Sequence, residues 1–216
     1  MLKSLLTNGF SLNTIIMVLL RIVVVLLAIS VHEMAHGFAA YKLGDNTAKY
    51  DGRLSLNPLR HLDPFGALCM LFFGFGWAKP VMVNPNYFKN HKRDMALTAL
   101  AGPVSNFIMS YIGMLVYLHL CPLVDNIYLN TFFYMFINLN IGLGIFNLIP
   151  IPPLDGSKIF LSLLPGRIYY EIMRYEQFGF IVLIVALYLN VLDPILSFLS
   201  SFIIDILFFA AGGGLL

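Results

Sequence analysis

The sequence predicts an all-α integral membrane protein with about five transmembrane helices and a short re-entrant segment of strand-like character. Two observations predict this class. Of the 216 residues, 59% are hydrophobic and only 11% are charged, whereas a soluble domain carries about 25% charged residues. The apolar residues are also gathered into long runs. We expect one membrane-embedded domain, 1–216, with a motif-bearing core at about 12–160 and a C-terminal helical hairpin at about 175–212.

The candidate spans follow from the length of each apolar run, because a helix needs about 20 mostly apolar residues to cross a bilayer. Five runs qualify or nearly do, at 12–40, 94–122, 127–150, 175–192 and 194–212. The first is too long for a signal peptide and has no cleavage-type break, so we interpret it as a retained span. A sixth run, FGALCMLFFGFGWA at 65–78, is too short and glycine-rich to span. We expect it to be re-entrant and to line a cavity.

The basic residues indicate the orientation of these spans. Of the 13 Lys and Arg residues, 11 lie in three segments, 42–64, 79–93 and 157–174. The positive-inside rule makes these segments cytoplasmic. We therefore expect a multi-pass protein of the cell membrane with an outer N-terminus and an inner C-terminus. The net charge of +2 gives no indication of a nucleic-acid partner, and the sequence leaves open whether the chain forms a homo-oligomer.

The first span contains the motif HEMAH, in which His32 and His36 lie four residues apart. On a helix, both imidazoles project from one face. This geometry suits two ligands of a tetrahedral zinc ion, with Glu33 beside them as the general base for a metal-bound water. The alternative is a chance match with two core histidines. Ionisable residues are rare in a membrane span, which disfavours that alternative.

A catalytic zinc site usually has three protein ligands and one open position. Asp155, in NLIPIPPLDGSKIF, is the best candidate for the third ligand, because it follows the prolines that end the third predicted span. Taken alone, it also suits the cap of a following helix. The other histidines, His61, His91 and His119, are less well placed. The first and third predicted spans both run from outside to inside, so Asp155 and the two motif histidines meet on the cytoplasmic side.

Several motifs in order resemble those of the site-2 proteases, which are intramembrane zinc metalloproteases, and in particular the small bacterial branch without PDZ or CBS domains. HEMAH (32–36) is similar to the zinc-binding motif of that family. The segments that resemble other family motifs are GDNTAKYDGRLSLNPLRHLDPFG (44–66), GFGWAKPVMVNP (74–85), AGPVSNF (101–107) and FNLIPIPPLDG (146–156). The resemblance covers about residues 28–160.

The resemblance implies that one Zn²⁺ per chain is bound by His32, His36 and Asp155, with Glu33 as the catalytic base. It also implies that four residues bind substrate, namely Asn106, Asn147, Gly74 and Gly76. For both asparagines, a hydrogen bond between helices remains an equal alternative, and the glycines can equally serve to bend the chain. His61 and Asp63 match the branch pattern, and for them we expect a loop-ordering role.

The sequence therefore favours an intramembrane zinc endopeptidase that acts on transmembrane protein substrates within the lipid bilayer. Two alternatives remain, a membrane protein that holds zinc structurally and a metal transporter. A structural site has no need of Glu33, and a transport path requires polar side chains that continue toward the outer face. Between Arg21 and Ser30, the first span offers none.

Overall fold

The structure, a computed structural model, describes residues 11–66 and 79–214. The regular elements of these residues are α-helices and short 3-10 helices. Within this part of the chain, four helices are long and apolar enough to cross a membrane: α2 (Leu12–Lys42), α5 (His91–His119), α7 (Ile127–Asn147) and α11 (Asp193–Ala210). The prediction of an all-α membrane protein is confirmed. Residues 67–78 of the predicted re-entrant segment lie outside the described residues.

Local sequence signals set the ends of the long helices. Ser11 before α2, Asn90 before α5 and Asn126 before α7 each accept a hydrogen bond from a backbone N–H of the first turn, at 3.2, 3.2 and 2.9 Å. Such caps satisfy donors that the start of a helix leaves unpaired. After α2 the chain turns through Gly44, whose φ of 111° suits a residue without a side chain.

The segment 175–192, predicted as a span, differs from the other four. It contains α10 (Glu176–Tyr188), which has 13 residues and is therefore about 20 Å long, whereas the hydrocarbon core is about 30 Å thick. Tyr175 leaves helical geometry just before α10, and Asn190 adopts a left-handed φ of 54° soon after it. Hydropathy alone did not reveal these two breaks.

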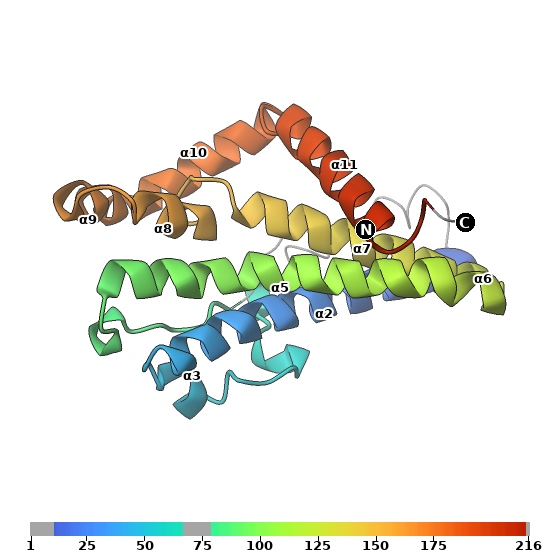
Figure 1. The fold of residues 1–216 in the computed structure, drawn as a ribbon, viewed down its shortest axis with the longest axis horizontal. Coiled ribbons are helices and arrows are strands. Elements are labelled where there is room, and N and C mark those ends of the chain that lie inside the picture. Colours follow the sequence, from blue (N-terminus) through green and yellow to red (C-terminus); the bar gives the residue numbers. More distant parts are fainter. Residues whose placement is uncertain (1–10, 67–78, 215–216) are drawn as a thin grey trace.

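The centre of the bundle is α5, which packs along both α2 and α7 (Figure 1). Glycines allow α5 and α7 to approach closely. A β-carbon at Gly113 would lie 2.9 Å from the ring of Phe136, and one at Gly144 would lie 2.9 Å from the ring of Phe107. Small residues commonly mark such contacts between membrane helices. One core cluster joins this pair to the end of α11 and consists of Met114, Ile137, Ile141, Ile145 and Ala211.

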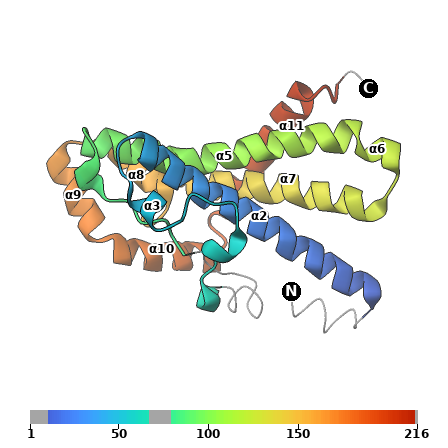
Figure 2. The same cartoon turned by 90° about the horizontal axis from the view of Figure 1, so that it is seen from below.

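Several short helices gather at one end of the bundle. These are α3 (Thr47–Tyr50), α8 (Asp155–Leu161) and α9 (Gly166–Arg174), and they lie opposite α6 (Cys121–Val124), as Figures 1 and 2 show. The 3-10 helices η1 (Pro58–Arg60) and η2 (Pro85–Tyr87) belong to the loops between α3 and α5. In Figure 1, α10 and α11 form a V-shaped hairpin. A cluster of Leu154, Leu183 and Leu192 attaches it to the turn before α8.

Candidate metal centre

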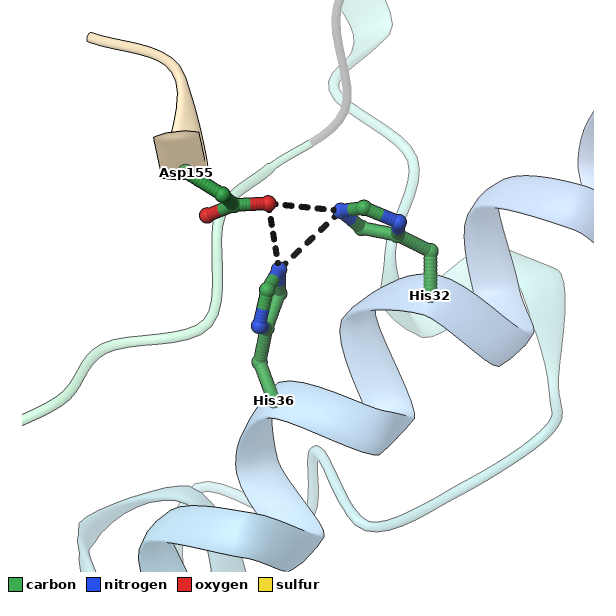
Figure 3. A group of neighbouring side chains, drawn as sticks. All are labelled: His32, His36 and Asp155. Carbon is green, nitrogen blue, oxygen red and sulfur yellow. Dashed lines mark hydrogen bonds and ion pairs between the residues drawn. The ribbon is translucent and has the colours of Figure 1, made fainter. Parts of the chain in front are cut away.

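Three side chains converge where the C-terminal half of α2 meets the start of α8 (Figure 3). The Nε2 atoms of His32 and His36 lie 3.2 and 3.1 Å from Oδ2 of Asp155, and 3.0 Å from each other. The two histidines lie one helical turn apart on α2, so both rings leave the same face. All three residues are buried, with exposed fractions of 5%, 9% and 8% in sequence order. The structure thus brings together residues that lie about 120 positions apart in the sequence.

This triangle of nitrogen and oxygen atoms fits a metal ion. At zinc–ligand distances of about 2.0–2.2 Å, tetrahedral ligand atoms lie about 3.3–3.6 Å apart, a few tenths of an ångström more than the separations of 3.0–3.2 Å here. Within the described residues, Oδ2 of Asp155 is buried and has no hydrogen-bond partner apart from its contacts with these imidazoles.

The Nδ1 atom of each imidazole, which faces away from Asp155, also has a hydrogen-bond partner. His36 Nδ1 lies 2.8 Å from the backbone oxygen of Thr98, and His32 Nδ1 lies 2.6 Å from Oδ1 of Asn106. Both contacts come from α5. Metal-binding histidines usually donate their second ring N–H to an acceptor in this way, which fixes the orientation of the ring. Through these contacts, α5 orients both rings so that Nε2 faces Asp155.

Glu33 lies next to this triangle and is partly exposed. Its Oε2 accepts a hydrogen bond of 2.9 Å from the backbone N–H of Val81. This bond ties the segment 79–84, which is neither helix nor strand, to α2. The other end of that segment is tied by Asp45, whose Oδ2 accepts from the N–H of Asn84 at 2.7 Å. Two carboxylates thus hold the same stretch of chain against the site.

A cavity of about 310 Å³ opens beside these residues. His32, Glu33, His36 and Asp155 all line it. The remaining lining comes from the segment Pro80–Val83, from α5 and from the region around α8, with Met95, Thr98, Ala99, Asn147, Pro153 and Lys158. The cavity is thus enclosed by the same elements that orient the histidines.

Of the residues predicted to bind substrate, the two asparagines differ in whether they line the cavity. Asn147 lines the cavity, and its Nδ2 donates to the backbone oxygen of Leu143 at 3.0 Å. Asn106 is fully buried, at 0% exposed, and contacts His32 instead of the cavity. Gly74 and Gly76 lie outside the described residues.

His61 and Asp63 bond to the backbone of their own loop. His61 is buried, and its Nε2 lies 2.7 Å from the backbone oxygen of Ser55. Asp63 accepts from the N–H of Gly66 at 2.8 Å. The backbone oxygen of His61 also accepts from the N–H of Lys79, at 2.8 Å. This loop therefore adjoins the segment 79–84 beside the cavity. These contacts agree with the expected loop-ordering role.

Sequence reasoning missed three residues around the site. Asn140 on α7 is fully buried and bonds to Asn106, and its signal was a polar side chain in an apolar run. Asp45 is a fully buried carboxylate in the loop after α2. Lys158 lines the cavity one turn after Asp155, and its spacing from Asp155 was a usable signal.

Comparison with known proteins indicates the family of the chain. The family model described as Peptidase family M50 matches residues 122–189, which include Asp155. The chain is 43% identical over 170 residues to YwhC of Bacillus subtilis, a protein described as a zinc metalloprotease, and the match covers 76% of this chain and 78% of that one. It is 26% identical over 171 residues to Rip2 of Mycolicibacterium smegmatis, described likewise, with 75% and 64% covered. No solved structure matches the chain significantly.

The fold and these relatives define the class: a multi-pass membrane zinc metallopeptidase. The chain belongs to peptidase family M50, the site-2 proteases.

Proposed function

We propose that the chain is an intramembrane endopeptidase that hydrolyses peptide bonds in or near the transmembrane segments of other membrane proteins. The observation that carries this proposal is the convergence of His32, His36 and Asp155 beside Glu33 in one cavity. Each chain holds one zinc ion at these three residues. When bound, the ion would supply a Lewis acid for the scissile carbonyl and would lower the pKa of a water molecule.

Glu33 is the general base of the proposed reaction. Its carboxylate lines the same cavity as the three ligands, and it precedes His36 by three residues, so its side chain leaves α2 next to that of His36. Glu33 takes a proton from the attacking water and then delivers it to the leaving amine. Asn147, on the cavity wall, donates to the charge that develops on the carbonyl oxygen.

The depth of the site supports cleavage within the membrane. α2 ends at Lys42, and His36 and His32 lie six and ten residues earlier, which is about 9 and 15 Å along a helix. The segments that carry 11 of the 13 basic residues adjoin the end of the bundle that holds α3, α8 and α9 (Figure 1). By the positive-inside rule, we assign this end to the cytoplasmic side of the cell membrane.

The segment Pro80–Val83 is the proposed docking edge for substrate. A helical substrate hides its carbonyl groups, so a peptide must be extended to be cut. The side chains of Glu33 and Asp45 hold the N–H groups of Val81 and Asn84, which keeps this segment beside the cavity. An extended peptide can add to such an edge as a further strand. We assign the same role to Gly74 and Gly76, which precede this segment.

The test compares cells that carry this chain with cells that carry Glu33→Gln, with Glu171→Gln as the matched control, since Glu171 is exposed on α9. We expect new protein termini in or beside transmembrane segments with the wild-type chain and with Glu171→Gln, and none with Glu33→Gln. All three purified chains should hold about one zinc ion. Cleavage by Glu33→Gln would assign the base elsewhere, and a wild-type chain without zinc would overturn the proposed metal site.

A further inference from the structure

His32 receives its hydrogen-bond partner from a buried pair of asparagine side chains. Asn106 on α5 lies 2.6 Å from His32 Nδ1, and Asn140 on α7 lies 2.8 Å from Asn106. Both asparagines have an exposed fraction of 0%. Neither lines the cavity. Their contribution to the site is therefore made through His32.

The direction of each hydrogen bond in this chain is fixed by two backbone carbonyls. Asn140 Nδ2 lies 2.9 Å from the backbone oxygen of Phe136. A carbonyl can only accept, so the amide nitrogen of Asn140 faces Phe136 and its Oδ1 faces Asn106. Asn106 must then donate from Nδ2 to Asn140 at 2.8 Å, and the same nitrogen lies 3.4 Å from the backbone oxygen of Ala28.

The Oδ1 atom of Asn106 is thereby left facing His32, and it too can only accept. The hydrogen in the contact of 2.6 Å must therefore be on Nδ1 of His32. An imidazole that carries its hydrogen on Nδ1 has the lone pair of Nε2 free for a metal. Nε2 is also the atom that faces Asp155.

We propose that Asn106 and Asn140 are positioning residues that keep the hydrogen of His32 on Nδ1 and aim Nε2 at the metal. His36 needs no such pair, because its Nδ1 already faces a backbone carbonyl, that of Thr98, at 2.8 Å. The two ligands thus have the same tautomer, one fixed by the main chain of α5 and the other by side chains from α5 and α7. This inference rests on the proposed zinc site.

The first test measures zinc affinity of the full chain in detergent by competition with a chromophoric chelator. Asn106→Leu keeps the volume of the side chain and removes the acceptor, so we expect affinity to fall about 10- to 100-fold. Asn106→Asp keeps an acceptor for His32 but loses the Nδ2 donor to Asn140, so its affinity should lie between those of wild type and Asn106→Leu. Asn140→Leu removes a contact one step further from the ligand and should lower zinc affinity several-fold.

Ser110→Ala is the matched control. Ser110 is also fully buried on α5, and its hydroxyl donates to α7 at the backbone oxygen of Ile137, at 3.2 Å. It makes the same kind of contact between the same two helices without touching His32. We expect its zinc affinity to equal that of wild type. An equal loss in Ser110→Ala and Asn106→Leu would assign the effect to helix packing and overturn the proposal.

A second readout reports the hydrogen itself. In the zinc-loaded chain labelled with ¹⁵N-histidine, the Nδ1–H of His32 should give a slowly exchanging, low-field proton signal. That signal should move and exchange faster in Asn106→Leu and persist in Ser110→Ala. A signal that is unchanged in Asn106→Leu would overturn the proposal.

The outcomes separate this inference from the proposed function. If wild type binds zinc tightly and Asn106→Leu binds it equally well, the positioning role fails and the metal site stands. If wild type binds no zinc, both fail. Should Asn106→Leu not fold, Asn140→Leu decides, because its side chain lies one residue removed from His32, and unchanged affinity there would overturn the role.

Discussion

The backbone of Gly102 on α5 lies directly against the ring of His36. A β-carbon at Gly102 would lie 2.5 Å from both Nε2 and Cε1 of His36, and 2.6 Å from Cε1 of His32. Real side chains do not approach so closely, so α5 can support the two imidazoles only with glycine at this position. The glycine of the AGPVSNF motif is therefore explained by its contact with the proposed ligands.

We expect Gly102→Ala to lower zinc affinity by about tenfold or more, because both imidazoles must move and each loses the partner that orients it. Chelator competition measures the change. Gly142→Ala on α7 is the control, since a β-carbon there meets no atom within 4 Å. Zinc binding by Gly102→Ala that equals wild type would mean that α5 can withdraw from the rings at no cost.

Removal of the metal should lower the thermal stability of the chain. The proposed ligands join α2 to α8, and a ligand at about 1,000 times its Kd stabilises the folded state by about 4 kcal/mol. Thermal unfolding followed by circular dichroism, with and without chelator, measures the difference. Asp155→Ala should melt at the lower temperature in both conditions. If chelator shifts the melting of Asp155→Ala as much as that of wild type, the stabilising ion is bound elsewhere.

Asp45→Asn should loosen the segment 79–84 beside the cavity. The buried carboxylate of Asp45 accepts from the N–H and hydroxyl of Thr47 and from the N–H of Asn84, at 2.9, 2.5 and 2.7 Å. An amide offers only one oxygen, so at least one donor loses its partner, which costs about 1–3 kcal/mol. We expect faster amide hydrogen exchange at residues 81–87 and unchanged zinc affinity.

The control for this prediction is Asp51→Asn, because Asp51 is an exposed carboxylate in the same loop region. Its exchange pattern should match that of wild type. Equal protection of residues 81–87 in Asp45→Asn would show that Glu33 and the neighbouring loop suffice to hold the segment.

Gly179→Ala should disturb the turn that carries Asp155. On α10, Gly179 lies against Pro152, and a β-carbon there would overlap the backbone oxygen of Pro152. The turn must then shift, so we expect weaker zinc binding although Gly179 does not line the cavity. Gly166→Ala is the control, because its nearest contact would be an ordinary one, 4.0 Å from the ring of Tyr170. Unchanged affinity in Gly179→Ala would mean that α10 moves instead.

Much of the fold and the proposed ligand set could be predicted from the sequence, for a physical reason. Long apolar runs must be helical in a membrane because every backbone group needs an internal partner, so α2, α5, α7 and α11 followed from hydropathy. The spacing of His32 and His36 follows from helical geometry. Counting crossings then placed Asp155 at the same side of the membrane as the histidines.

The contacts around the ligands could not be predicted in this way. Asn106 and His32 lie 74 residues apart, and their contact depends on how α5 is rotated against α2, which no periodicity encodes. The sequence therefore left open whether Asn106 binds substrate or another helix. Nor could the bond from Val81 to Glu33 be predicted, because it joins an irregular segment to a helix across 48 positions.

That bond between Val81 and Glu33 affects how an inactive form should be made for capturing substrates. Replacing Glu33 with alanine removes the carboxylate and also releases Val81 and its segment from α2, so a bound polypeptide would lose part of its support as well as its cleavage. Glutamine retains a side-chain oxygen that can accept from the same N–H. Glu33→Gln is therefore the better inactive variant for capturing bound substrates. Pull-downs with Glu33→Ala should recover fewer partners.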